Sequence, residues 1–419
     1  MKHIVFIVGS YYPFFSAVGN CIGNIAAEFD QDYEVTVIAL KNVIQQEDKG
    51  HYRSQDIIRI SYRMNDSRIE IDDKLKTAKG FNRQICKMKL LFAKFYRYIS
   101  TVLAASGCNK ELTKAYLEGL ERIEKPIDLI IPTCNPFESV KAALMYKAQY
   151  PDTVIIPVLF DLFASSVNVN RGVYGRRKHW KENVKLERLM FERSDFVFHV
   201  ANWTNHIKNC FPEFVRKTEE IEHPLLVHRE MGNPKKENNE IHVVYTGVVD
   251  TNSRNPKATL EVLSKIETRN VRYDFYSFGS AQNIVNEYAL SSNGIIAHGK
   301  VNSEKAKEAR GNANILLSIG NVDSSQTPSK LIEYVATGKP ILHFMQCEDD
   351  PVTKLLSRYP LSKIIDIRAG YDVGDIEKFI IDNANKCLNF DSVKMLYHDA
   401  DPKYIKEQLL AKIPRGGIK

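Results

Sequence analysis

The chain has 419 residues, of which 44% are hydrophobic and 26% charged, and its formal net charge is +7. This length is typical of two or three domains, and the composition is that of a globular protein. No stretch of about 20 apolar residues occurs, so we expect no transmembrane helix, and the apolar N-terminal run is too short for a signal peptide. Seven scattered cysteines without a Cys-x-x-Cys pair indicate reduced thiols of a cytoplasmic protein, not a disulfide framework or a zinc site.

The N-terminal residues predict a βαβ unit, with a strand over 3–8, a helix over 21–29 and a strand over 33–40. The loop over 9–20 is rich in small residues, but its glycines do not have the Gly-x-Gly-x-x-Gly spacing of a dinucleotide site. Ligands of open α/β sheets bind at the carboxyl ends of strands. This position favours a ligand-facing role for the loop, and a plain connecting loop is the alternative.

A basic segment follows a polar region that contains short strands, for example over 57–60. Residues 74–120 are predicted to be helical, and within 74–99 lysines and arginines interleave with aromatic and aliphatic residues. This pattern is typical of an amphipathic helix on an anionic membrane surface. An equally good interpretation is a solvated basic face over a stripe that packs into the core. Nucleic acid is not favoured, because no base-reading or RNA-binding motif accompanies the segment.

Two further features belong to the first half of the chain. An apolar strand over 154–160 delivers Asp161 at its carboxyl end, where a carboxylate can bind hydroxyl groups or transfer protons, or can cap the next segment. Residues 171–185 are basic and contain two glycines, which predicts either a mobile loop that contacts an anionic acceptor or a plain exposed loop.

The βα alternation restarts after a polar, breaker-rich stretch over 229–240, which is the best linker candidate. Strands are predicted over 241–245, 271–278, 295–296 and 315–319, each followed by a helix. Alternating strands and helices indicate a second α/β domain. We therefore predict the following domains: 1–232 with a basic helical insertion over 74–120, 240–395, and a C-terminal helix over 396–419 that crosses back onto the first domain.

The segment 327–340 predicts a short helix between two strands. Pro328 ends the preceding segment, and Ser329 is a good N-cap. The start of such a helix offers unpaired N–H groups and a positive dipole end to an anion, and Lys330 adds a full charge. Glu333 lies one turn further on, where it can accept hydrogen bonds from sugar hydroxyls. An ordinary capped helix is the alternative.

This segment, Pro-Ser-Lys-Leu-Ile-Glu-Tyr-Val-Ala-Thr-Gly-Lys-Pro-Ile, resembles the donor-site motif of retaining GT-B glycosyltransferases of family four. The resemblance is closest to the bacterial surface-polysaccharide branch and covers about fourteen contiguous residues. It implies an α/β GT-B fold, with two Rossmann-like domains that face each other across a cleft. It also implies that Glu333 binds the ribose of a nucleotide sugar and that the helix start faces the diphosphate.

The resemblance is incomplete at two places. The family commonly has an arginine directly after the glycine at the end of the second domain's first strand, whereas a valine follows Gly247 here. The surface-polysaccharide branch more often has Arg-x-Pro, which Arg254 opens, so Arg254 is the implied stabiliser of the leaving diphosphate, with Lys330 second and Lys257 third. The family also has a glutamate eight positions before Glu333, and this position holds a serine, so the family's acid–base geometry is not carried over.

The resemblance therefore implies three sets of site residues. The catalytic residues are Arg254, Lys330 and Asp161. The donor-binding residues are Gly247, Arg254, Lys257, Gly299, Asn321, Pro328, Ser329, Lys330, Leu331 and Glu333. The acceptor-binding residues are Tyr12, Ser16, Gly19, Asn20 and Asp161.

The implied activity is transfer of a sugar from a nucleoside-diphosphate sugar, with UDP as the expected nucleotide, to a hydroxyl of a glycan, lipid-linked or protein-linked acceptor. Transfer retains the anomeric configuration and needs no metal or other cofactor. The expected setting is capsule or other surface-polysaccharide or glycoconjugate assembly in the cytoplasm, at the inner face of the plasma membrane if residues 74–99 bind it. A non-catalytic GT-B-like partner subunit or glycan-binding protein is the alternative, and a sugar-nucleotide epimerase is less favoured.

Overall fold

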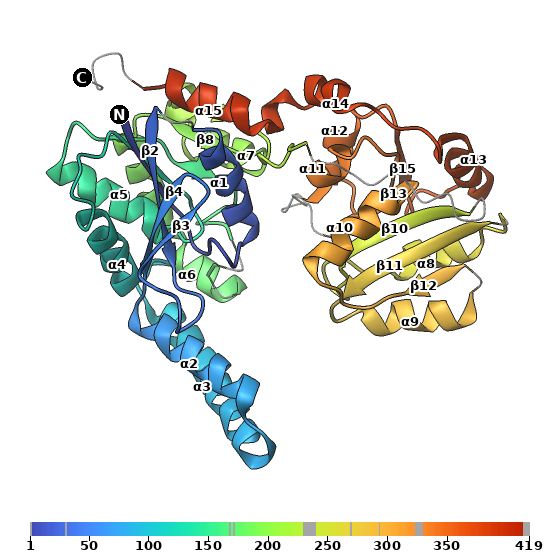
Figure 1. The fold of residues 1–419 in the computed structure, drawn as a ribbon, viewed down its shortest axis with the longest axis horizontal. Helices are drawn as coiled ribbons and strands as arrows, with labels where there is room; N and C mark the ends of the chain where they lie inside the picture. Colours follow the sequence, from blue (N-terminus) through green and yellow to red (C-terminus); the bar gives the residue numbers. More distant parts are fainter. Residues whose placement is uncertain are drawn as a thin grey trace. The chain divides into compact units, whose positions relative to one another are not determined.

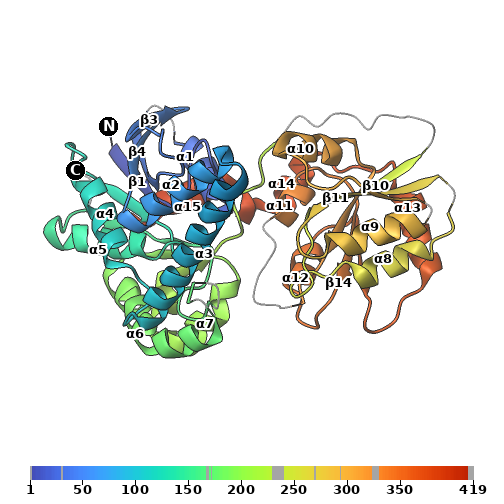
Figure 2. The same cartoon turned by 90° about the horizontal axis from the view of Figure 1, so that it is seen from below.

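The computed structural model describes residues 2–29, 32–166, 169–170, 172–228, 240–268, 270–292, 294–322 and 330–413. The chain divides into two compact units, Met1–Pro224 with Pro402–Lys419, and Leu225–Asp401 (Figures 1 and 2). Each unit contains a six-stranded sheet with helices against it. None of the described helices is long and apolar enough to cross a membrane.

The first unit opens with the predicted βαβ unit. Its sheet has the order β3-β4-β2-β1-β5-β6, and every neighbouring pair is parallel except β3 and β4. The strands are β1 (Lys2–Ile7), β2 (Tyr33–Leu40), β3 (Lys49–Tyr52), β4 (Gln55–Ile60), β5 (Leu129–Pro132) and β6 (Val154–Ile155). Helix α1 (Ala17–Ala27) begins before the predicted residue 21, because the Ser16 hydroxyl accepts from the Gly19 N–H and caps the helix there.

Helices α2 (Arg63–Thr77) and α3 (Gly80–Leu103) form a hairpin that projects from the rest of the first unit (Figure 1). The prediction of helix from residue 74 is correct for α3 and for α4 (Lys110–Glu121), but α2 already begins at Arg63. Further helices of this part are α5 (Glu138–Gln149), α7 (Asn202–Cys210) and a 3-10 helix, η1 (Pro212–Lys217).

The predicted strand over 154–160 is wrong as a single element. It is divided between β6, in the first sheet, and β7 (Val158–Leu159), which forms a second sheet with β8 (Val197–His199) and β9 (Thr218–Glu220). Pro157 lies between β6 and β7, and a proline has no backbone N–H to donate to a ladder. The chain therefore changes sheets at this residue.

The predicted mobile loop over 171–185 is also wrong, because residues from Val173 form α6 (Val173–Arg193). Its glycine, Gly175, marks a close backbone approach, since a Cβ there would lie 1.9 Å from the Asn170 carbonyl oxygen. His179 and Asn183 are buried on this helix, and both hydrogen-bond to Asn170 Oδ1, at 3.2 and 2.9 Å. Gly175 therefore reflects tertiary packing and not a flexible loop.

The second unit holds an all-parallel sheet in the order β12-β11-β10-β13-β14-β15, the strand order of a Rossmann domain. Its strands are β10 (Ile241–Val248), β11 (Val271–Phe278), β12 (Ile295–Ala297), β13 (Ile315–Ile319), β14 (Ile341–Met345) and β15 (Ser362–Asp366). Its helices are α8 (Lys257–Ser264), α9 (Gln282–Ser291), α10 (Ser303–Asn312), α11 (Lys330–Val335), α12 (Pro351–Leu356), α13 (Val373–Asn383) and α14 (Phe390–Leu396), with a 3-10 helix η2 (His398–Ala400). The predicted linker over 229–240 lies outside the described residues except for residue 240.

The last helix, α15 (Pro402–Ala411), packs against α1 of the first unit. The Lys406 ammonium donates to the Glu28 carbonyl oxygen at 2.8 Å and lies 5.5 Å from the centre of the Phe29 ring. Beyond the helix, Lys412 pairs with Glu219 at 2.7 Å. These contacts attach the C-terminal segment to the first unit.

Candidate functional site

The loop after β10 is closed by hydrogen bonds around one carboxylate. The backbones of Asp250 and Arg254 exchange hydrogen bonds at 2.9 and 3.1 Å. The Asp250 carboxylate accepts from the Ser280 hydroxyl at 2.6 Å and from the N–H groups of Asn252 and Ser253, both at 2.9 Å. These hydrogen bonds, that of Ser280 foremost, lower the pKa of Asp250 to about 2. An ionised Asp250 thus holds the loop in the shape that positions Arg254.

Arg254 connects this loop to the loop after β13. Its Nε and Nη2 atoms both donate to Asn321 Oδ1, at 3.0 and 2.8 Å. The Val322 N–H donates to the Ser253 carbonyl oxygen at 2.9 Å, which ties the two loops together. Strands β10 and β13 are neighbours, so their carboxyl ends meet. The structure therefore brings together Arg254 and Asn321, two of the predicted donor-binding residues.

Glu333 is held on α11 by an arginine that the sequence analysis missed. Arg310, near the end of α10, donates from Nη2 to Glu333 Oε2 at 3.2 Å and from Nη1 to Thr246 Oγ1 at 3.2 Å. Its side chain is only 8% exposed. The sequence signal for a buried Arg310 was its position between an alanine and a glycine near the end of the helix. The other charged residues of this helix are exposed in the structure.

Four charged groups lie close together at this edge of the sheet. Partial burial lowers the pKa of Lys330, the positive charges of Arg310 and Arg254 lower it further, and the Glu333 carboxylate opposes them. Arg310 forms an ion pair with Glu333, and the charges of Arg310, Glu333 and Arg254 all act on Lys330. Within the described part of the chain, neither Arg254 nor Lys330 pairs with a carboxylate, and Lys330 remains exposed to a ligand.

The other predicted donor-binding residues have varied surroundings. Gly247 lies within β10, where a Cβ would come 3.2 Å from the Tyr245 hydroxyl, so close packing is one reason for a glycine there. Leu331 is buried in the core. Lys257 is exposed at the first residue of α8, and its charge is not among those that shift the pKa of Lys330. Gly299 has a φ of +69° in the turn after β12.

Two predicted donor-binding residues, Pro328 and Ser329, lie outside the described residues, as does the serine that replaces the family's first glutamate. Helix α11 itself is fixed to β10 through Tyr334. The Tyr334 hydroxyl lies 3.2 Å from the Thr246 backbone nitrogen and 3.1 Å from its hydroxyl. After the helix, Gly338 is in the left-handed region, with a φ of +71°.

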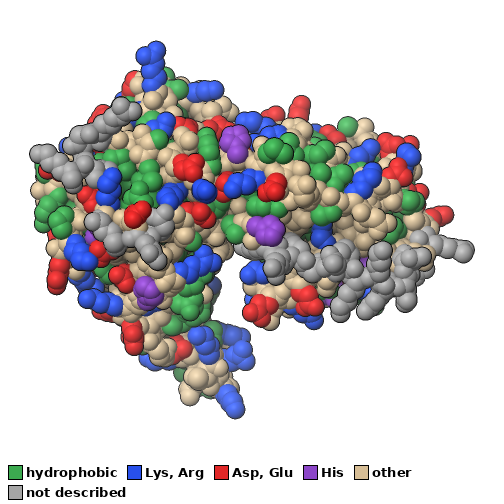
Figure 3. All heavy atoms as spheres, turned by 45° about the horizontal axis from the view of Figure 1, so that its top comes forward, with side chains coloured by type: hydrophobic (Ala, Val, Ile, Leu, Met, Phe, Trp, Pro, Cys, Tyr) green, Lys and Arg blue, Asp and Glu red, His purple; other side chains and the backbone are tan. Residues whose placement is uncertain are grey.

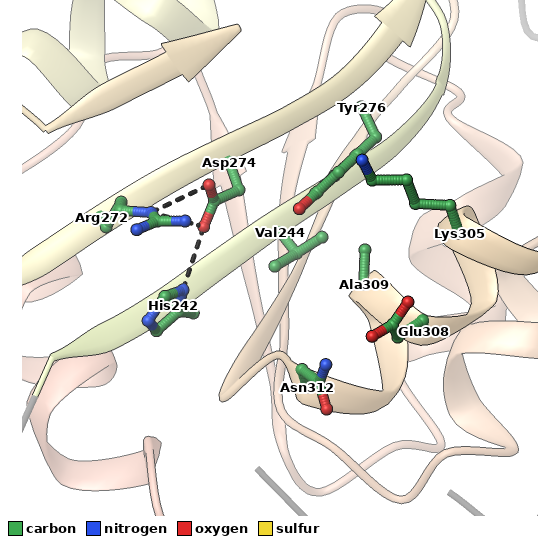
Figure 4. A pocket seen from close by; sticks show the side chains of 9 residues that line it. All are labelled: His242, Val244, Arg272, Asp274, Tyr276, Lys305, Glu308, Ala309 and Asn312. Atoms are coloured by element: carbon green, nitrogen blue, oxygen red, sulfur yellow. Dashed lines mark hydrogen bonds and ion pairs between the residues drawn. The ribbon is translucent and has the colours of Figure 1, made fainter. Parts of the chain in front are cut away.

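A cavity of about 200 Å³ lies between β10, β11 and α10 (Figure 4). Its centre is the buried Asp274, which lies 2.9 Å from Arg272 Nε, 3.1 Å from His242 Nδ1 and 2.6 Å from His298 Nε2. Burial opposes ionisation of Asp274, but these partners lower its pKa. The ring of His298 stacks on Tyr276 at 4.1 Å, so this histidine is engaged within the unit. Among the described residues, no three His, Cys, Asp or Glu side chains are arranged to hold a metal.

The predicted acceptor loop is shaped by two of its four candidate residues. Ser16 caps α1, and a Cβ on Gly19 would lie 2.2 Å from the Ser10 carbonyl oxygen, so both have structural roles. Tyr12 is exposed and stacks on Tyr52, with ring centres 4.3 Å apart. Asn20 is exposed on α1. Of these four candidates, the side chains of Tyr12 and Asn20 are the ones open to a ligand.

Asp161 lies just beyond β7, close to the end of β5. Its Oδ2 atom accepts from Asn135 Nδ2 at 3.1 Å, and its carbonyl oxygen accepts from Trp203 Nε1 at 3.0 Å. The next helix, α6, begins only at Val173, so Asp161 is not its N-cap. The carboxylate is partly accessible and oriented by an amide, as an acceptor-binding group would need to be.

The fold is that of GT-B glycosyltransferases, with two Rossmann-like domains, which confirms the predicted fold class. One similar solved structure is sucrose-phosphate synthase from Thermosynechococcus elongatus, at 12% identity and a TM-score of 0.55 over 99% of this chain and 95% of that chain. Another is the lipopolysaccharide outer core galactosyltransferase WaaB, at 12% identity and a TM-score of 0.54 over 98% and 99%.

A third similar structure is an alpha,alpha-trehalose-phosphate synthase (UDP-forming) from Burkholderia xenovorans in complex with glucose-6-phosphate. It is 8% identical, with a TM-score of 0.56 over 99% of this chain and 100% of that chain. No protein-family model and no curated protein sequence matches the chain. At these identities the likeness establishes the fold.

Proposed function

We propose that this protein is a glycosyltransferase whose second unit binds a nucleoside-diphosphate sugar. The observation that carries the proposal is the pair Arg254 and Lys330. Within the described residues these two cations form no ion pair with a carboxylate. Arg254 lies on the loop after β10 and contacts Asn321 after β13, and its charge acts on Lys330. Charge grows on a diphosphate as its bond to the sugar breaks, and fixed cations stabilise the developing charge most strongly in the transition state.

The structural neighbours support a nucleotide-sugar donor. One of them is a UDP-forming synthase, and another, from E. coli, is bound with UDP-2-fluoro glucose. For this chain we assign the diphosphate to Arg254 and Lys330 and the ribose hydroxyls to Glu333, whose carboxylate Arg310 holds in place. UDP is the proposed nucleotide, and we propose membership of family four because of the resemblance of the 327–340 segment.

The proposed reaction retains the configuration at the anomeric carbon. The bond from the sugar to the diphosphate oxygen breaks, a bond to the acceptor hydroxyl oxygen forms on the same face, and the hydroxyl proton passes to the diphosphate. No protein nucleophile or metal takes part. Tyr12, Asn20 and Asp161 are the proposed acceptor-binding side chains, and the acceptor is a hydroxyl of a growing surface polysaccharide or glycoconjugate on the cytoplasmic side of the membrane.

The test is a panel of nucleotide sugars assayed for nucleoside-diphosphate release, with Arg254→Ala and Glu333→Ala beside the wild type. Loss of a transition-state cation should lower kcat by about 100-fold or more, and loss of Glu333 should weaken donor binding about tenfold. Lys307→Ala, an exposed lysine of α10, is the matched control and should behave as wild type. Unchanged turnover in both site variants would refute the assignment.

A non-catalytic GT-B-like subunit is the second candidate, because a serine replaces the family's first glutamate and a valine follows Gly247. This candidate is favoured if the folded protein binds UDP but releases no nucleoside diphosphate from any donor, whichever acceptor is supplied. A sugar-nucleotide epimerase would instead convert the donor sugar into its epimer, which chromatography of the nucleotide sugars detects.

A further inference from the structure

Helix α3 of the projecting hairpin carries a large apolar surface that no described part of the chain covers. It has 24 residues, and none of them is buried. The exposed fractions along one face are 80% for Phe81, 58% for Met88, 69% for Leu91, 66% for Phe92 and 62% for Phe95. Helices of globular proteins normally bury such a stripe against a core.

The packing of the hairpin does not account for this stripe. The partly buried residues Cys86, Leu90, Ala93 and Arg97 recur at helical spacing on a different flank of α3. Helix α3 contacts α2 along the hairpin and α6 at its base. Since the partly buried flank accounts for these contacts, the aromatic stripe is left facing solvent.

The stripe is bordered by positive charge. Helix α3 contains five basic residues and no Asp or Glu: Arg83, Lys87, Lys89, Lys94 and Arg97. By helical spacing, Lys87 and Lys94 lie along one edge of the stripe and Lys89 along the other. Among the described residues none of these cations forms an ion pair, and Lys and Arg side chains gather over the projecting hairpin in Figure 3.

We propose that α3 docks the protein on an anionic lipid bilayer, with its axis in the plane of the interface. Phe81, Phe92 and Phe95 would enter the boundary between headgroups and acyl chains, while the flanking lysines reach the lipid phosphates. The helix does not cross the bilayer, since it is not apolar enough. A second copy of the chain is the less suitable partner, because pairing two α3 stripes would bring unbalanced lysines together.

The proposal does not depend on the assignment of the donor site. Its test is co-sedimentation of the full chain with vesicles of phosphatidylcholine alone and of phosphatidylcholine with phosphatidylglycerol. The wild type should sediment with the anionic vesicles at low salt, and less as salt rises. The double variant Phe92→Ser, Phe95→Ser should lose binding. The triple variant Lys87→Gln, Lys89→Gln, Lys94→Gln should bind more weakly, by about fivefold for each lysine removed.

The matched control is the triple variant Lys114→Gln, Lys307→Gln, Lys378→Gln, which removes the same charge from exposed positions outside the hairpin. It should bind as wild type. All substituted residues are exposed, so circular dichroism and melting temperature should not change. Absence of binding to anionic vesicles at low salt would overturn the proposal, as would equal binding by the control and the α3 lysine variant. A concentration-dependent dimer that the Phe92 and Phe95 substitutions abolish, without vesicle binding, would assign the stripe to a second copy.

Discussion

Replacement of the buried Arg310 tests how the proposed donor site is built. Arg310→Met keeps most of the side-chain volume but removes the charge that holds Glu333 and Thr246. Removal of one partner of a fully buried ion pair costs about 3–5 kcal/mol. The Glu333 side chain is 20% exposed, and water can replace part of the lost interaction. We therefore expect a loss of about 1–3 kcal/mol in the free energy of unfolding.

The same substitution should also change the site itself. Glu333 would lose its fixed orientation, and loss of one hydrogen bond to a ribose, about 1.4 kcal/mol, corresponds to a tenfold weaker affinity for UDP. Burial, and after it the Arg310 charge, lower the pKa of Lys330 from its usual 10.5. Activity that needs a protonated Lys330 is therefore lost as pH rises through the lowered pKa. Without Arg310 the pKa of Lys330 should rise, and the alkaline limb of the pH–rate profile should move to higher pH.

Three measurements check this reasoning: urea unfolding, calorimetric titration with UDP, and the pH dependence of diphosphate release. Lys307→Met, an exposed position on the same helix, is the control and should leave all three unchanged. If Arg310→Met binds UDP as tightly as wild type and keeps the same alkaline limb, Arg310 does not position Glu333 or act on Lys330.

Three other substitutions have defined outcomes. Asn321→Ala should free the Arg254 guanidinium and lower the rate of diphosphate release about tenfold, with little change in melting temperature. Gly338→Ala should cost about 2 kcal/mol or more in urea unfolding, because φ is +71° and the new Cβ would meet a backbone oxygen at 2.0 Å. The pKa of Asp250 lies below its unfolded value, so its contribution to stability is present above about pH 4 and lost as pH falls toward 2. Ser280→Ala should raise that pKa and reduce acid stability in this window, and a variant with an unchanged acid transition would contradict this account.

Several elements follow from local pattern alone. Strands β2, β11 and β13 have the predicted bounds. Each is a continuous apolar run or a periodic stripe between breaker residues, and such signals need no distant partner. The segment 154–160 is also apolar throughout, and its pattern predicts one strand. The pattern did not show that the chain leaves the first sheet at Pro157 and enters the second.

The incorrect loop prediction has a related cause. Glycines and basic residues over 171–185 indicate a loop when only neighbours in the sequence are considered. In the structure, Gly175 lies against the backbone of Asn170, and the buried His179 and Asn183 complete the contact. A glycine selected for close packing and a glycine selected for flexibility have the same appearance in a sequence.

The sequence by itself was enough to predict three residues of the proposed site, because Lys330 and Glu333 share one motif and Arg254 opens another. Only the tertiary structure decided which groups act together. Arg310 is 64 residues from Thr246 and 23 from Glu333, and these three side chains meet because β10 and β13 are adjacent in the sheet. Spacing along a helix or strand is encoded locally, whereas the charges that shift a pKa or hold a carboxylate depend on strand order, which brings distant segments to one edge.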